Sequence, residues 1–179
     1  LQANNGVANQ LWINQGDGTF REEGSKRGVA DKGWGFAASF ADYDNDGDPD
    51  LSVANDFGQN RLYRNRGEGT FEDVTASSGA TDAGFGMGIS WGDVDGDGRL
   101  DQYVSNMYST AGNRLLSAED EPRLHKMARG NTLLRNRREG TFEDVSKKAG
   151  VGRAGWAWSN SFLDYNSDGY PDLYVANGY

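Results

Sequence analysis

Bulky and small side chains alternate with a period of two in three segments of the chain. Residues 34–40 read WGFAASF, residues 85–91 read FGMGISW, and residues 156–162 read WAWSNSF. Such alternation is typical of β-strands, whose successive side chains point to opposite faces of a sheet. The second face of each segment carries only Gly, Ala or Ser, which predicts that a neighbouring strand or sheet approaches it closely.

A second motif interleaves with the alternating segments. NQLWINQGDGTF at 9–20 recurs as NRLYRNRGEGTF at 60–71 and as NTLLRNRREGTF at 131–142. Each repeat then holds four short strands: the alternating strand, a strand after it such as 50–54, the N-x-L strand, and a strand that begins at TFEDV. The last two are joined by a predicted hairpin turn, as at Asp17-Gly18. Because about four strands in about 50 residues is the size of one propeller blade, we predict an all-β fold of β-propeller-type blades, each with four antiparallel strands.

The repeats also define the predicted organisation of the chain. We assign residues 1–179 to one repeat region, with units at about 1–32, 33–83, 84–154 and 155–179 and an insertion at 109–130. The first unit holds only the last two strands of a blade and the last unit only the first two, so the chain carries about three blades' worth of strands. Propellers usually close with about four to eight blades, so we expect these units to be part of a larger propeller or assembly.

An Asp-rich loop of nine residues follows each alternating segment, with the pattern D-x-[DN]-x-D-G-x-x-D in all three copies. Calcium takes about six to eight oxygen ligands, and oxygens at alternate positions of a tight loop can converge on one point. Gly at position six permits the sharp turn, and the backbone carbonyl of position seven can serve as a ligand whatever its side chain. The predicted ligand residues, at positions one, three, five, seven and nine, are Asp42, Asp44, Asp46, Asp48 and Asp50; Asp93, Asp95, Asp97, Arg99 and Asp101; and Asp164, Asn166, Asp168, Tyr170 and Asp172.

Two other interpretations of these loops are less well supported. An EF-hand shares the opening of the pattern but needs a Glu at position twelve and a helix on each side. Here position twelve is Val53, Val104 or Val175, within strand-like runs. Asp, Asn and Gly are also common in ordinary turns. Three copies with one spacing, each between two strand-like segments, instead predict metal loops that bind about three Ca²⁺ per chain.

The ordered motifs resemble a known family. W-G-F or F-G-M-G, the D-x-D-x-D-G-x-x-D loop, D-L-x-V-A-N and N-x-L-Y-x-N-x-G-x-G-T-F together resemble the FG-GAP/VCBS repeat of integrin-α-like propeller blades, over nearly the whole chain except 109–130. The resemblance implies a propeller of about seven blades, an extracellular or cell-surface location, and calcium held by the side chains at positions one, three, five and nine. Asn166 departs from the pattern because it replaces a carboxylate, so we expect the third site to bind more weakly.

Composition narrows the set of partners. The formal net charge is −9, with 27 acidic against 18 basic residues. This excess of acidic residues does not favour binding to nucleic acid or to an anionic membrane, and it favours metal cations as partners. Cysteine is absent, which excludes disulfides and thiolate metal sites. No apolar run approaches the roughly 20 residues that a membrane-spanning helix needs.

Three functions remain open at this point. The leading one is an extracellular, calcium-binding structural or interaction module, not an enzyme, that presents loops to a protein or glycan. The first alternative is a propeller domain of a calcium-dependent enzyme that acts on polysaccharide, with His125 or an Asp as acid or base. The second is a structural subunit that assembles head to tail through its half-blade ends into a ring or filament.

Overall fold

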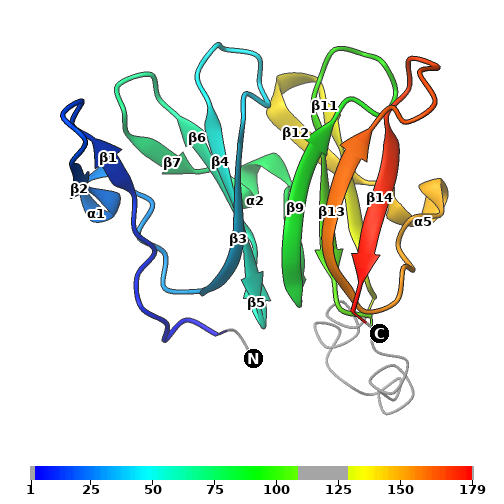
Figure 1. Ribbon diagram of the computed structural model, residues 1–179, viewed down its shortest axis with the longest axis horizontal. Coiled ribbons are helices and arrows are strands. Elements are labelled where there is room, and N and C mark those ends of the chain that lie inside the picture. The colour runs from blue at the N-terminus through cyan, green and yellow to red at the C-terminus, as the bar shows by residue number, and fades with distance from the viewer. Residues whose placement is uncertain (1–2, 109–128, 179) are drawn as a thin grey trace.

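A computed structural model describes residues 3–108 and 129–178 of the chain as a row of twisted antiparallel sheets (Figure 1). Two of the sheets have four strands. The first sheet has the strand order β3-β4-β6-β7, and the second has the order β12-β11-β10-β9. Their strands are β3 (Trp34–Ala41), β4 (Asp50–Asp56), β6 (Arg61–Asn65) and β7 (Phe71–Asp73) in the first sheet, and β9 (Gly86–Gly92), β10 (Asp101–Asn106), β11 (Thr132–Arg137) and β12 (Thr141–Asp144) in the second.

Two hairpins flank the four-stranded sheets. The N-terminal hairpin consists of β1 (Trp12–Asn14) and β2 (Phe20–Glu22), and the C-terminal hairpin of β13 (Ala157–Leu163) and β14 (Asp172–Asn177). A short extra pair, β5 (Gly58–Gln59) with β8 (Ala83–Gly84), links the segment between β4 and β6 to the segment just before β9. Two complete sheets and two complementary half-sheets confirm the predicted fold class of four-stranded antiparallel blades.

The alternating segments form the inner strand of each sheet, and these strands lie side by side. β9 lies against both β3 and β13, as Figure 1 also shows. The close approach predicted from the small-residue face is confirmed at Gly88, because a Cβ placed there would lie 3.1 Å from the Cα of Ser159 on β13. Glycine in β9 therefore allows the C-terminal hairpin to pack directly on the second sheet.

The strict alternation predicted for the inner strands is interrupted in the structure. Each inner strand has a register shift near its start, which leaves Phe36, Met87 and Trp158 without a directly opposed residue. A β-bulge of this kind bends the strand and increases its twist. Sequence periodicity does not reveal the bulge because the bulky residue at this position continues the period-two pattern.

The apolar core consists of layers between successive sheets. One cluster joins the two four-stranded sheets and contains Tyr43, Leu62, Val74, Ala80, Leu134 and Phe142, with Trp91 packed against it. A second cluster, between the N-terminal hairpin and the first sheet, contains Val29, Leu51, Val53 and Tyr63, with Leu11 and Phe71 against it. Each sheet is thus stabilised by apolar contacts with its neighbours as well as by the backbone hydrogen bonds between its own strands.

A short helix that we did not predict follows the outer strand of each repeat: α1 (Gly24–Arg27), α2 (Thr75–Ser78) and α5 (Ser146–Ala149). Each ends at a glycine in the left-handed conformation. In the second repeat, Thr75 Oγ1 accepts a hydrogen bond from Leu62 N at 2.9 Å, and in the third Ser146 Oγ accepts one from Leu133 N at 2.8 Å. The first residue of α2 and of α5 is therefore hydrogen-bonded to the backbone near the start of the third strand of its sheet.

The turn between the last two strands of a repeat differs from one repeat to another. The hairpin predicted at Asp17-Gly18 is confirmed, with Gln15 N donating to Thr19 O at 2.9 Å. In the third repeat the turn is a 3₁₀ segment, η1 (Arg138–Gly140), in which Glu139 has φ 69°.

Within the described residues, no helix combines the length and apolar character required to cross a bilayer.

Candidate metal sites

The three Asp-rich loops lie at one edge of the row of sheets, uppermost in Figure 1, where each joins an inner strand to the next strand of its sheet. The predicted turn at position six is confirmed by φ values of 94°, 82° and 87° at Gly47, Gly98 and Gly169. Position four is also left-handed, with φ 59° at Asn45 and 61° at Ser167. Two left-handed residues per loop fold the chain back tightly.

The first Asp of each loop closes this turn by accepting two backbone hydrogen bonds. Asp42 accepts them from Asp46 N at 3.1 Å and from Gly47 N at 2.9 Å. Asp93 and Asp164 make the same pair of bonds in their own loops. The same local geometry in three loops means that this turn is determined by the repeat sequence itself.

In the two four-stranded sheets, the ninth Asp of the loop anchors the loop to its sheet. Asp50 accepts hydrogen bonds from Tyr43 N at 3.2 Å and from Asn65 N, on β6, at 2.8 Å. Asp101 makes the equivalent bonds, and both carboxylates are 1% exposed. The conformation of the loop is therefore coupled to the third strand of the same sheet.

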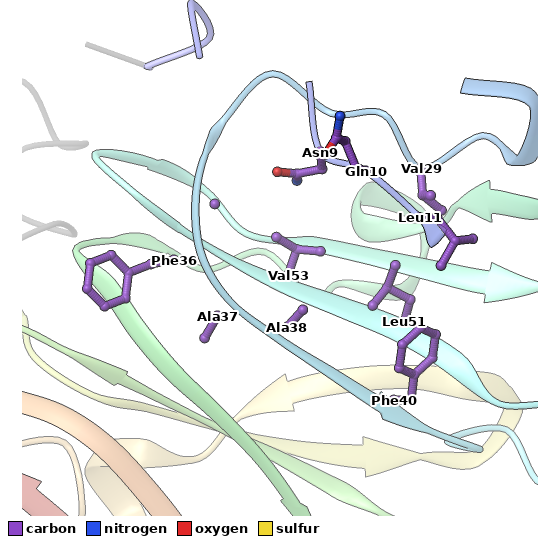
Figure 2. A pocket seen from close by; sticks show the side chains of 11 residues that line it. Asn9, Gln10, Leu11, Val29, Phe36, Ala37, Ala38, Phe40, Leu51 and Val53 are labelled. Atoms are coloured by element: carbon purple, nitrogen blue, oxygen red, sulfur yellow. The ribbon is translucent and has the colours of Figure 1, made fainter. Parts of the chain in front are cut away.

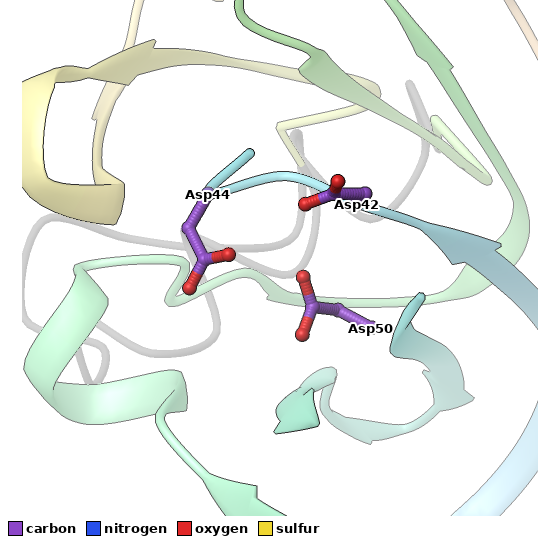
Figure 3. Close-up of side chains that lie close together, drawn as sticks. All are labelled: Asp42, Asp44 and Asp50. Carbon is purple, nitrogen blue, oxygen red and sulfur yellow. The ribbon is translucent and has the colours of Figure 1, made fainter. Parts of the chain in front are cut away.

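The loop geometry brings carboxylates together at two points. In the first loop, one oxygen each of Asp42, Asp44 and Asp50 lie within 4.8 Å of one another, and Figure 3 shows the three side chains turned toward a common centre. In the second loop the same holds for the group Asp93, Asp95 and Asp101. These groups correspond to positions one, three and nine of the pattern and offer only oxygen donors.

Electrostatics disfavours these clusters in the absence of a cation. Burial, with a contribution from Asp44 and Asp46, raises the pKa of Asp50 to about 7, although hydrogen bonds from Asn65 and Tyr43 act in the opposite direction. Burial also raises the pKa values of Asp44 and Asp101. Asp44 Oδ1 is buried and has no hydrogen-bond partner. A divalent cation would supply the missing interaction and stabilise the charged carboxylates, so the residues fit such an ion.

The side chains at positions five and seven lie outside the carboxylate groups formed by positions one, three and nine. Asp46 and Asp97 are outside the two carboxylate groups, and each accepts a hydrogen bond from the backbone N of position seven, at 2.9 and 3.0 Å. The Arg99 guanidinium pairs with Asp97 and also donates to Asn136 O at 3.4 Å. Asp48 is half-buried, with Oδ2 near Gly67.

The third loop differs from the other two in composition and setting. Asn166 Nδ2 donates to Asp168 Oδ2 at 2.9 Å, and Asn166 Oδ1 accepts from Asp168 N at 3.1 Å. Asp172 accepts a hydrogen bond from Tyr165 N at 3.4 Å and is only half-buried, because the described residues form no third strand beside β14. Tyr170 is 65% exposed. His125, considered as an acid or base, lies outside the described residues.

Comparison with known proteins agrees with this architecture. Cartilage acidic protein 1 of Mus musculus is 30% identical over 176 residues, which cover 95% of this chain and 25% of that protein. The Homo sapiens protein of the same name is also 30% identical, over 95% of this chain and 24% of its own length. The chain thus spans about a quarter of the length of these relatives. The model of the FG-GAP-like repeat matches residues 2–53, 42–104 and 116–175, and the chain therefore belongs to the FG-GAP-like repeat family.

Proposed function

We propose that the three Asp-rich loops bind Ca²⁺, about three ions per chain, and that the ions stabilise a repeat-built interaction module. The side chains at positions one, three and nine supply the central ligands. Because calcium needs about six to eight oxygens, the position-five side chains Asp46, Asp97 and Asp168 and the position-seven carbonyls of Asp48, Arg99 and Tyr170 complete the shells. The repeat units at about 1–32, 33–83, 84–154 and 155–179 are then each organised around one loop, the first unit excepted.

The observation that carries this proposal is the carboxylate group of the first loop. Three carboxylates meet within 4.8 Å, and the buried Asp44 Oδ1 has no hydrogen-bond partner. Like charges at such separations repel strongly where water is excluded. A cation with hard oxygen preferences removes both the repulsion and the unsatisfied atom, and oxygen-only donors favour calcium over the softer transition metals.

The role of the ion is structural in this proposal. In the two four-stranded sheets, the ninth Asp of the loop would bind the ion while it accepts a hydrogen bond from the backbone N of Asn65 or Asn136 on the third strand. An ion at the loop therefore stabilises the link between the loop and its sheet. The three loops lie at the same edge, so the ions also order one continuous surface of the molecule.

We further propose that this surface binds a protein or glycan outside the cell, and that the role is binding rather than catalysis. Loops of this kind have weak sites suited to the high calcium concentration found there. The relatives are named as cartilage acidic proteins, which supports a matrix setting for this chain. Tyr165 and Tyr170, 75% and 65% exposed on the third loop, offer aromatic contacts to such a partner.

Thermal melting of the full chain, with excess EDTA or with calcium, tests the metal proposal. Asp44→Ala should lose a large part of the calcium-dependent rise in melting temperature because it removes one central ligand. Asp48→Ala is the matched control: it removes a carboxylate from the same loop but keeps the proposed carbonyl ligand, so it should retain the rise. The proposal is wrong if calcium fails to stabilise the wild type, or if both variants respond to calcium as the wild type does.

A further inference from the structure

An aspartate stands at the same repeat position in the two segments that lead into β3 and β9. Asp31 lies in GVADKGW at 28–34, and Asp82 lies in GATDAGF at 79–85. Each carboxylate accepts a hydrogen bond from an asparagine side chain on the second strand of the sheet that follows, Asn55 at 3.1 Å for Asp31 and Asn106 at 3.1 Å for Asp82. The two aspartates therefore occupy equivalent places in successive contacts between repeats.

In the first of these contacts, an arginine of the third strand bridges two carboxylates. Arg61 Nε lies 3.4 Å from Asp31 Oδ1, and Arg61 Nη1 lies 3.5 Å from Asp73 Oδ2 at the end of β7. The planar guanidinium has donors on several sides, which suits it to bind two carboxylates at once. Its positive charge also offsets the repulsion between Asp31 and Asp73.

In the second contact, a much shorter residue replaces this arginine. Thr132 stands at the repeat position of Arg61, and Asp144 at that of Asp73. Thr132 Oγ1 donates a hydrogen bond to Asp82 Oδ1 at 2.9 Å. The hydroxyl therefore satisfies part of the Asp82 carboxylate, but it brings no positive charge between Asp82 and Asp144.

The Asp144 carboxylate shows what the replacement leaves open. Asp144 Oδ1 accepts a hydrogen bond from Ser146 N at 3.0 Å, as Asp73 Oδ1 does from Thr75 N at 3.0 Å. The other oxygen of Asp73 is paired with Arg61. Among the described residues, none donates a hydrogen bond to Asp144 Oδ2 or forms an ion pair with it. This oxygen is thus available to a group from outside the chain.

A cleft of about 780 Å³ lies beside Thr132 and is lined by both Asp82 and Asp144. Asn131 also lines it; this residue is 3% exposed, and its buried Nδ2 atom has no hydrogen-bond partner. The cleft therefore offers two carboxylates and one unused amide donor. It can accept hydrogen bonds from a cation and donate one to a neighbouring carbonyl.

The basic residues of the cleft do not take the place of Arg61. Arg129, Lys147 and Arg153 line the cleft, but none of the three forms an ion pair with a carboxylate in the part of the chain that the structure describes. Burial raises the pKa of Asp82, and the charge of Asp144 adds to the rise. A guanidinium between these two carboxylates would stabilise their charged forms.

A second hollow shows that such charges are not a general property of the spaces between neighbouring sheets. It has a volume of about 260 Å³ and lies beside the N-terminal hairpin, where Leu11, Leu51 and Val53 contribute to its wall (Figure 2). All the residues that line it are uncharged. The carboxylates and cations beside Thr132 are therefore particular to the contact between the second and third repeats.

We propose that the cleft binds the guanidinium group of an arginine side chain from a partner protein, in the place that Arg61 fills in the preceding contact. Asp82 and Asp144 accept its hydrogen bonds, because the donor geometry of arginine matches carboxylates. Asn131 Nδ2 donates to a backbone carbonyl of the same peptide segment.

The cleft is separate from the Asp-rich loops. Thr132, which lines it, begins β11, whereas Asn136, near the other end of β11, donates its backbone N–H to Asp101 of the second loop. Cleft and loop thus lie at opposite ends of the same sheet. Arginine binding can therefore be tested independently of the calcium sites.

Heteronuclear NMR of the isotope-labelled full chain, titrated with N-acetyl-arginine amide in calcium buffer of low ionic strength, tests the proposal. Amide signals near Asp82, Thr132 and Asp144 should shift and saturate. N-acetyl-citrulline amide has nearly the same shape without the charge, so it should not produce these shifts. N-acetyl-lysine amide should bind less tightly, because an ammonium group lacks the planar arrangement of donors.

Two matched substitutions locate the site. Asp144→Asn keeps the oxygen that accepts from Ser146 but loses the charge, and it should weaken binding by about tenfold. Asp73→Asn makes the same change one repeat earlier, on a carboxylate that Arg61 already pairs, so it should bind the arginine derivative as the wild type does. Asp144 is exposed, and an unchanged circular dichroism spectrum confirms that its variant folds.

Exchange of the two repeat positions gives a further test. Thr132→Arg supplies the guanidinium from the chain itself, so it should abolish binding and raise the melting temperature. Arg61→Thr should create a second site, with new shifts near Asp31 and Asp73. The proposal is overturned if the wild type shows no saturable shifts near Thr132, or if the citrulline or lysine derivative binds as tightly as the arginine derivative. Equal affinities of Asp144→Asn and Asp73→Asn, or undiminished binding by a folded Thr132→Arg chain, would also overturn it.

Discussion

The backbone N of Asn136 donates a hydrogen bond to Asp101 Oδ1 at 2.7 Å, so the last residue of the second Asp loop is tied to the third strand of its sheet. The other carboxylate oxygen accepts from Val94 N at 2.9 Å. Asp101 is therefore both a sheet-building residue and a member of the carboxylate group. Asp95, in the same group, accepts no comparable backbone bond among those described and pairs only with Arg135, at 3.6 Å.

This difference predicts different outcomes for two substitutions in one loop. Asp101→Ala removes an acceptor from two backbone N–H groups and should lower the free energy of unfolding by about 3 kcal/mol even in EDTA. Asp95→Ala should leave the stability in EDTA nearly unchanged, because an exposed ion pair contributes little and one repelling charge is lost. Both should reduce the stabilisation by calcium. Urea unfolding with and without calcium measures all four values, and equal losses in EDTA would contradict the assigned roles.

The third loop should bind calcium more weakly than the first two, because Asn166 supplies a neutral amide oxygen where the others have a carboxylate. Asn166→Asp should tighten that site by roughly tenfold, since ligand charge is one of the factors that set affinity in such loops. In EDTA the same change should be neutral or slightly destabilising. Calorimetric titration of the variant beside the wild type resolves the change, and an unaltered weakest site would show that Asn166 is not a ligand.

Metal selectivity provides an independent prediction. Calcium should raise the melting temperature more than equal concentrations of magnesium or zinc. Magnesium requires a smaller octahedral shell and loses water reluctantly. Zinc prefers sulfur and nitrogen ligands, and the described loops contain none. Differential scanning fluorimetry with the three chlorides makes the comparison, and an equal shift with zinc would argue against an oxygen-only site.

Asp82 should give the fold a measurable pH dependence. Its carboxylate accepts hydrogen bonds from Asn60, Asn106 and Thr132, and burial raises its pKa above the ordinary 3.8, with Asp144 adding to the rise and these bonds opposing it. The charged residues that line the same cleft are Asp144, Arg129, Lys147 and Arg153. A carboxyl group with a raised folded-state pKa loses stabilising free energy as the pH rises above its unfolded value.

Asp82→Asn removes this titration while it keeps the size of the side chain. The stability difference between wild type and variant should therefore be largest near pH 4 and narrow toward pH 7, by at most about 1.4 kcal/mol per pH unit. Urea unfolding at several pH values, with calcium held in excess, measures the difference. A gap that widens with pH would show that the folded state stabilises the ionised form of Asp82.

Sequence patterns predicted the strands well because each strand is an element with its own periodicity. The alternation at 34–40 corresponds to β3, and the repeated N-x-L and TFEDV motifs correspond to the third and fourth strands of the blades. The helices α1, α2 and α5 were not predicted because four residues are too few for a helical period to emerge. Their C-terminal glycines, Gly28, Gly79 and Gly150, are the sequence signal that could have indicated them.

Spacing was less informative about which side chains of a loop converge. Positions one, three and nine meet, whereas the position-five carboxylates of Asp46 and Asp97 accept hydrogen bonds from their own loops. The exposure of Phe40 and Tyr174 also could not be predicted from alternation, because alternation identifies a face but not whether a neighbour covers it. Both properties depend on contacts between distant parts of the chain.

The central claim is that the Asp-rich loops are calcium sites, and isothermal titration calorimetry of the full chain, stripped with EDTA and dialysed, tests it most directly. The account predicts about two to three equivalents of Ca²⁺ per chain, with dissociation constants between about micromolar and millimolar, the third site weakest. Saturable heat that is lost for one equivalent in Asp44→Ala would support the assignment of the first loop. No heat of binding, together with an unchanged melting temperature in calcium, would contradict it.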